Sequence, residues 1–143
     1  MIRKRSARAL AGGLATILLL VAASAAYAAV SGKFSGKTGQ KQSISFHVGN
    51  GQLTNMRFGV LLKCPSGHTY LGHDKVLGAI KINAKHRFDK KLASTTSPTT
   101  DELEVSGTVF SKKVTGKLTE HLQIKKEKNA ICVGRTSYTA HKQ

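Results

Sequence analysis

Apolar and polar residues alternate along most of this chain, and this period-two pattern constrains the fold more than any other feature. The clearest apolar row consists of five alternate residues: Met56, Phe58, Val60, Leu62 and Cys64. Successive side chains of a β-strand point to opposite faces, so this row predicts a strand with one buried face. Helical periodicity is nearly absent after residue 28, and the chain is therefore predicted to be all-β.

Turn residues separate the apolar rows. Asn50-Gly51 lies between the rows at residues 44–48 and 56–64, and both residues tolerate the positive φ of a tight hairpin. Further strands are predicted at residues 31–38, 68–76, 77–82, 86–92, 103–109, 114–124 and 130–140. Residues 93–100 are polar and contain Pro98, so they predict an exposed loop. The pattern predicts an antiparallel β-sandwich of eight or nine short strands, with a small β-barrel as the alternative.

One acidic residue, Glu120, falls inside the apolar row at residues 114–124. A carboxylate is costly to bury, so we expect a bulge at Glu120 or a strand that leaves the core there. Three more acids, Asp101, Glu102 and Glu104, cluster at the start of the strand at 103–109. Their ordinary interpretation is a solvated loop edge.

Residues 1–28 have the layout of a secretory signal peptide. Four basic residues precede an apolar run at residues 9–23, and Ala26-Tyr27-Ala28 fits the small-x-small cleavage rule. The apolar run is shorter than the about 20 residues of a membrane span, although an uncleaved anchor helix is an alternative. We predict a Sec-type signal peptide at 1–28, cleaved after Ala28 or alternatively after Ala26. One secreted domain at 29–143 follows, with no stable membrane insertion after cleavage.

Cys64 and Cys132 are the two cysteines of the chain. Two cysteines in an exported protein can oxidise, so we predict one disulfide between opposing strands, with free or intermolecular thiols as the alternative. Such a bond closes a loop of about 69 residues, for which the chain-entropy model gives roughly 4 kcal/mol. Neither cysteine has a Cys-x-x-Cys partner, so a zinc site is not predicted here.

Basic residues greatly outnumber acidic ones. The chain has 23 Lys and Arg and 7 Asp and Glu, and four of the basic residues lie in the predicted signal peptide. The predicted mature domain keeps 19 basic residues against 7 acidic ones, a net charge of +12. A field of this sign attracts nucleic acid, acidic polysaccharide, teichoic-type polymers and anionic lipid. The alternative is that the charge only keeps an exported protein soluble.

Several short motifs follow one another in a recognisable order. They are Gly-x-aromatic-x-Gly-x-Thr at 32–38, Ile-Ser-Phe-x-Val at 44–48, Val-x-Gly-Thr at 105–108, Val-Thr-Gly-Lys-Leu at 114–118 and Ser-Tyr-Thr-Ala at 137–140. With the two cysteines, this order resembles a group of small secreted bacterial proteins, common in actinobacteria, whose function is uncharacterised. The resemblance covers nearly the whole chain after residue 28. It implies a β-sandwich and export, and it implies no catalytic residue.

Histidines suggest one metal hypothesis. His68, His73 and Asp74 offer ligand types that zinc and copper accept. Residues 68 and 73 have opposite strand parity, so a shared site needs a bulge or turn at Gly72. Solvent-facing histidines are the favoured interpretation, and we predict no metal site and no cofactor.

Nothing in the sequence marks an active site. A Gly-x-Ser-x-Gly elbow is absent from the chain, and a disulfide-bonded cysteine pair supplies no nucleophile. We therefore predict a non-enzymatic protein.

Basic residues give the better functional hypothesis. Nine of them are candidate anion-binding residues: Arg57, Lys63, Lys85, Arg87, Lys112, Lys113, Lys117, Lys125 and Lys126. Grouped cations neutralise phosphates or carboxylates, whereas scattered lysines only solvate a surface. The outward aromatic residues are limited to Tyr70 and Phe110, so base-specific nucleic-acid recognition is not expected.

Together these features predict a secreted, monomeric, non-enzymatic β-sandwich that binds an anionic extracellular polymer or cell-envelope surface through a basic face. The alternatives are a protein-interaction or inhibitor module and, third, a small secreted hydrolase.

Overall fold

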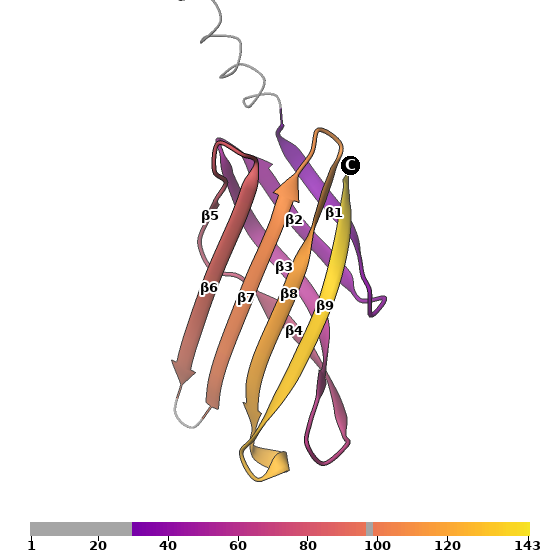
Figure 1. Ribbon diagram of the computed structural model, residues 1–143, viewed down its shortest axis with the longest axis vertical. Helices are drawn as coiled ribbons and strands as arrows, with labels where there is room; N and C mark the ends of the chain where they lie inside the picture. Colours follow the sequence, from indigo (N-terminus) through magenta and orange to yellow (C-terminus); the bar gives the residue numbers. More distant parts are fainter. Residues whose placement is uncertain (1–29, 97–98) are drawn as a thin grey trace, which may run out of the picture.

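A computed structural model of the protein describes residues 30–96 and 99–143, which form nine antiparallel β-strands (Figure 1). The strands are β1 Gly32–Thr38, β2 Ser43–Gly49, β3 Gln52–Lys63, β4 Thr69–Lys75, β5 Ile80–Lys81, β6 Arg87–Thr96, β7 Thr99–Val109, β8 Lys113–Ile124 and β9 Ala130–Lys142. One short 3-10 helix, η1 at Lys125–Glu127, links β8 to β9. The prediction of an all-β antiparallel fold is confirmed, and the predicted signal peptide at 1–28 lies outside the described residues. Within the described part of the chain, no helix has the length and apolar character needed to cross a membrane.

All nine strands belong to one sheet that folds over on itself. The strand order is β4-β3-β2-β1-β9-β8-β7-β6, and β5 pairs with β3. Figure 1 shows β6 to β9 as a front layer that crosses β1 to β4 behind it. A further pairing of Lys63 in β3 with Val133 in β9 joins the two layers directly. Among the described strands, β4 and β6 end the order without pairing to each other, so the sandwich is open along that side.

The predicted disulfide between Cys64 and Cys132 is confirmed. Cys64 directly follows β3 and Cys132 lies in β9, each next to the Lys63–Val133 pair. Their α-carbons are 4.2 Å apart, and 68 positions separate them in the sequence. The bond therefore fastens the back layer to the front layer at the point where β3 and β9 meet.

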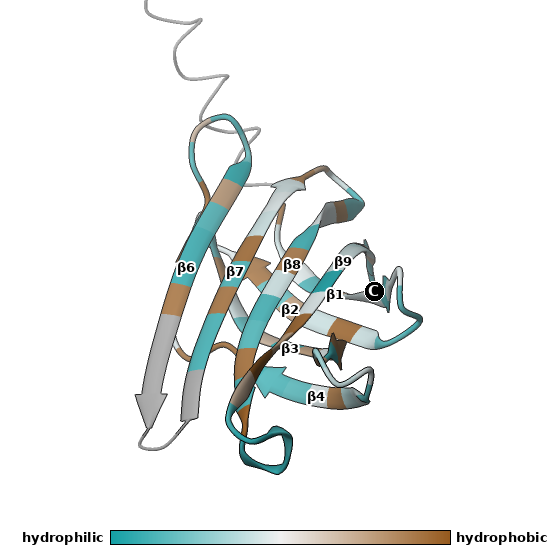
Figure 2. Cartoon of the chain, turned by 60° about the horizontal axis from the view of Figure 1, so that its bottom comes forward, coloured by the Kyte–Doolittle hydropathy of each residue, from teal (hydrophilic) through white to brown (hydrophobic). Residues whose placement is uncertain are grey.

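Alternation places the core as the sequence predicts. All five residues of the row from Met56 to Cys64 are buried. Phe46 stacks on Phe34 with ring centroids 5.8 Å apart and meets Tyr138 edge-on at 6.4 Å. Figure 2 shows the resulting alternation of hydrophobic and hydrophilic bands along β7 and β8.

The predicted hairpin at Asn50-Gly51 joins β2 and β3, and these residues have φ values of 52° and 70°. Two predictions, the loop at 93–100 and the strand at 77–82, need correction. Residues 93–96 and 99–100 belong to β6 and β7, which pair from Arg87–Thr108 to Thr96–Thr99. Threonine-rich segments suit strands, so this hairpin extends where apolar alternation is missing. The strand predicted at 77–82 is reduced to the two residues of β5.

The prediction of a bulge at Glu120, or of a strand that leaves the core there, is also wrong. Glu120 pairs in unbroken register with Leu103 of β7 and Gly134 of β9. Its side chain points inward with those of Leu118 and Leu122, and only 1% of the residue is exposed. The carboxyl stays inside the sandwich because β8 is paired on both sides, with β7 and with β9, at this position.

Candidate functional site

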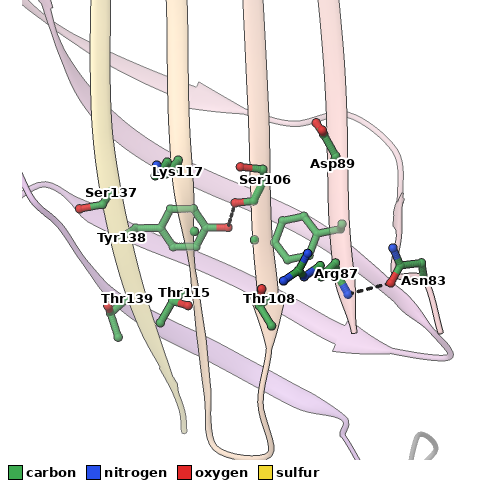
Figure 3. Close-up of a pocket in the computed structure, with 13 residues that line it drawn as sticks. Asn83, Arg87, Asp89, Ser106, Thr108, Thr115, Lys117, Ser137, Tyr138 and Thr139 are labelled. Atoms are coloured by element: carbon green, nitrogen blue, oxygen red, sulfur yellow. Dashed lines mark hydrogen bonds between the residues drawn. The ribbon is translucent and has the colours of Figure 1, made fainter. Parts of the chain in front are cut away.

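The outer face of the front layer carries an open hollow of about 810 Å³ (Figure 3). Its walls come from β6 to β9 and from the turn before β6. Five of the lining residues are serines and threonines: Ser106, Thr108, Thr115, Ser137 and Thr139. Two cations, Arg87 of β6 and Lys117 of β8, lie in the same hollow.

Strand register explains why these side chains meet. Arg87 pairs with Thr108, Thr108 with Thr115, and Thr115 with Thr139, which makes one row across four strands. A second row joins Ser106, Lys117 and Ser137, beginning at Asp89. These positions alternate with buried ones, so their side chains share the outer face.

Two glycines, Gly107 and Gly116, form the floor of the hollow as a directly opposed pair. A β-carbon on Gly107 would lie 2.5 Å from Phe88 Cζ, and one on Gly116 would lie 2.5 Å from Tyr138 Oη. The inner face of this floor is therefore filled by the two aromatic rings. Tyr138 Oη donates a hydrogen bond to the carbonyl oxygen of Ser106, 3.1 Å away (Figure 3).

Asn83 organises the turn that leads into β6. Its Oδ1 accepts hydrogen bonds from the backbone amides of Lys85 and Arg87, at 2.9 and 3.0 Å. The next turn lies beside it, because the amide of Val109 donates to the carbonyl oxygen of His86. These contacts place Lys85 and Arg87 at the same end of the sheet as the β7–β8 turn.

Five of the nine candidate anion-binding residues gather at that end. Lys85, Arg87 and Lys117 are joined there by Lys112 of the β7–β8 turn and by Lys113 at the start of β8. The ammonium group of Lys113 lies 5.5 Å from the ring centroid of Phe110.

The other four candidates lie elsewhere. Lys125 and Lys126 belong to η1, at the opposite end of the 12-residue strand β8. Arg57 and Lys63 are exposed on β3 of the back layer. The fold therefore distributes the nine candidate residues over more than one surface.

Acidic residues lie in the middle of the outer face of the front layer. Lys91 of β6 forms an ion pair with Glu102 of β7 at 2.8 Å, and the hydrogen bond from Lys91 lowers the pKa of Glu102. Glu104 lies next along β7 and pairs with Lys91 in register. This ion pair and Glu104 make the middle of the face less positive than the end that holds Arg87 and the β7–β8 turn.

A second cluster surrounds Glu127 of η1, whose side chain is only 6% exposed. Its Oε1 accepts from Tyr70 Oη at 2.6 Å and from His68 Nδ1 at 2.7 Å. Ser66, Tyr70 and His68, in that order, lower the pKa of Glu127 to about 2. Ser66 Oγ contacts the same Nδ1 at 3.3 Å. A Ser-His-acid triad needs the two ring nitrogens on different partners, so this arrangement is a structural tie between η1 and the β3–β4 hairpin.

Three carboxyl groups meet between the layers. Asp74 of β4, Asp101 of β7 and Glu120 of β8 place one oxygen each within 4.8 Å of one another. Burial, reinforced by Asp74 and then Asp101, raises the pKa of Glu120 to about 9. Burial, followed by the charge of Asp74, also raises the pKa of Asp101. The cluster disfavours full ionisation unless a counter-charge is present.

Sequence reasoning missed this cluster, although the chain carried a signal for it. Glu120 shares its parity with Leu118, and Asp101 shares its parity with Leu103. From the sequence, Asp74 is a candidate ligand only together with His68 and His73. In the structure His68 contacts Glu127, while His73 is exposed on the face of β4 opposite to Asp74.

Comparison of the chain with protein-family models, with curated proteins and with solved structures finds no match.

Proposed function

We propose that this is an exported, non-enzymatic protein that binds an anionic polymer in the hydroxyl-lined hollow of its front layer. The observation that carries the proposal is the convergence of Arg87 and Lys117, from different strands, on one hollow lined by five serine and threonine residues. The arrangement favours this surface over the basic residues of β3 and η1, which lie elsewhere.

The chemistry of the hollow suits phosphate, sulfate or carboxylate groups. A guanidinium binds such oxyanions through two parallel N–H donors, and an ammonium attracts them as a point charge. Serine and threonine hydroxyls donate to the same oxygens. Lys85, Lys112 and Lys113 extend the positive surface beyond the hollow, towards the end of the sheet. An extended polymer can therefore contact several cations in succession.

Asp89 lines the hollow in the same row as Lys117, with Ser106 between them, and limits what the hollow accepts. A carboxylate there repels an anion placed directly against it. We therefore expect a polymer with spaced charges, such as an acidic polysaccharide or a teichoic-type chain, to bind better than densely charged polyphosphate.

The test compares two double variants that remove the same charge. Arg87→Gln/Lys117→Gln changes the hollow, and Lys125→Gln/Lys126→Gln changes η1 at the other end of β8. Binding to heparin and to purified teichoic acid is measured over a series of salt concentrations. Each lost contact lowers the magnitude of the slope of log K against log salt concentration by roughly one. The slope of the hollow variant should therefore be smaller than that of the wild-type protein by about two. Equal losses in the two variants would show that only net charge matters and would remove the proposal.

Export is tested separately from binding. We propose that residues 1–28 direct secretion and are removed, as the sequence predicts. Amino-terminal sequencing of protein from culture medium should begin at Ala29. Material that stays with the cells and keeps Met1 would contradict export, and it would leave the result of the binding experiment unaffected.

A further inference from the structure

The acidic cluster between the layers links three strands that lie apart in the sequence. Glu120 is in β8 of the front layer, and Asp101 lies diagonally from it on neighbouring β7. Asp74 comes from β4 in the back layer. A β-carbon on Gly72, also in β4, would lie 3.5 Å from Glu120 Oε2, an ordinary van der Waals contact, so β4 faces the carboxylate across the interior.

The carboxyl groups of this cluster lack the partners that buried acids normally have. Both carboxylate oxygens of Glu120 are buried without a hydrogen-bond partner, and so is Oδ1 of Asp101. Within the described residues, the ion pairs that form are His68–Glu127 and Lys91–Glu102, and neither involves the cluster. Glu120 is almost fully buried, and one of its unpartnered oxygens lies within the cluster. A buried polar group left in this state is costly, so it points to a missing ligand.

We propose that Asp74, Asp101 and Glu120 form a binding site for a divalent cation that prefers oxygen ligands, with Ca²⁺ as the best fit. Carboxylates are the usual protein ligands of Ca²⁺, and Ca²⁺–oxygen bonds are about 2.3–2.6 Å long. Ligand oxygens on opposite sides of the ion are then up to about 5 Å apart, which accommodates a set lying within 4.8 Å. The ion balances two of the three negative charges in a region that contains no paired cation.

A neighbouring cavity gives the ion a route and room for water ligands. It measures about 280 Å³, and Asp74 and Asp101 line it together with Leu77 and Leu92. The cavity lies between β4 and β6, on the open side of the sandwich. Because three protein oxygens leave several Ca²⁺ positions empty, water from this cavity completes the coordination.

The test uses the folded domain after treatment with EDTA and removal of the chelator. Thermal unfolding is followed at neutral pH with millimolar Ca²⁺, Mg²⁺ or Mn²⁺, and Ca²⁺ binding is measured by calorimetry. We expect Ca²⁺ to raise the Tm by about 4 °C or more. Calorimetry should give a binding stoichiometry of one Ca²⁺ per molecule. Glu120→Gln should abolish the rise, whereas Glu104→Gln, an equal charge change on the outer face of β7, should keep it.

Asp74→Asn provides a second variant, because Asp74 is half-buried on an edge strand and its replacement leaves the core intact. It should also lose the Ca²⁺-dependent rise. No change of Tm with any of the three cations would overturn the proposal, since the cluster then only holds a proton. A Ca²⁺-dependent rise of Tm in Glu120→Gln equal to that of the wild-type protein would also overturn the proposal, because the ion would then be bound elsewhere.

Discussion

Tyr138 of β9 lies across Gly116 of β8, its partner in the strand register, and its hydroxyl reaches the Ser106 carbonyl on β7. A β-carbon on Gly116 would overlap that carbonyl oxygen and would lie 2.5 Å from Tyr138 Oη. One aromatic ring thereby crosses two strands below the floor of the hollow. The close approach of the Ser106 carbonyl oxygen and of the phenol requires glycine at position 116, and the phenol packs beneath the floor that carries the hydroxyl rows.

Gly116→Ala should therefore destabilise the protein by about 1–3 kcal/mol, the usual cost of overpacking. The measurement is the free energy of unfolding in urea. Gly72→Ala is the matched control, because its β-carbon would make only ordinary contacts at 3.5 Å or more. A comparable loss in both variants would mean that Gly116 has no special packing role.

Replacing both cysteines tests the junction of β3 and β9. Cys64→Ser/Cys132→Ser should lower the free energy of unfolding by up to about 4 kcal/mol, because the unfolded chain loses its cross-link. Reducing agent should lower the stability of the wild-type protein similarly and leave the variant unchanged. Stability that stays the same after reduction would show that the Lys63–Val133 pairing holds the layers without help.

How far the sequence could predict this molecule depends on where each residue has its partners. Alternation within one strand is enough to predict that the row from Met56 to Cys64 is buried. The turn at Asn50-Gly51 is predictable because these two residues themselves tolerate positive φ. Glu120 is different, because the space and acidic neighbours that receive it come from β4 and β7. The alternation of residues along β8 does not indicate that Gly72 and Asp74, which lie in β4 of the other layer, face Glu120.

The basic residues show the same limit. Lys112 and Lys125 are 13 positions apart in the sequence, on either side of the strand predicted at residues 114–124. A 12-residue strand at about 3.3 Å per residue separates them by roughly 40 Å. Lys85 and Lys112, much farther apart in sequence, belong to adjoining turns because His86 and Val109 share a hydrogen bond.

Acid should weaken the tie between η1 and the β3–β4 hairpin. The pKa of Glu127 falls from its ordinary value of 4.5 to about 2 in the folded protein, so the unfolded chain binds more protons between these values. The stabilisation is fully present above about pH 4.5 and is lost as the pH falls through about 2. Glu127→Gln should remove this part of the pH dependence in urea unfolding. Glu104→Gln, which changes an exposed acid, should retain the wild-type profile.

Without a bound cation, the carboxyl of Glu120 should be a net cost to stability. Glu120→Leu removes a buried group with no hydrogen-bond partner, so the free energy of unfolding in EDTA should rise by about 1–3 kcal/mol. Chemical denaturation at neutral pH measures this change. A loss of stability in EDTA would show that the carboxyl has favourable contacts inside the apo protein.

Asp74 also has a consequence for how molecules of this protein meet. β4 is an edge strand, and its free backbone groups offer a template on which a strand from another copy can add. An inward-facing charge on such an edge is a known safeguard, since a docked neighbour would cover it and strip it of water. The carboxyl that helps to form the interior cluster thus also opposes fibre-like growth through the exposed margin of the sheet.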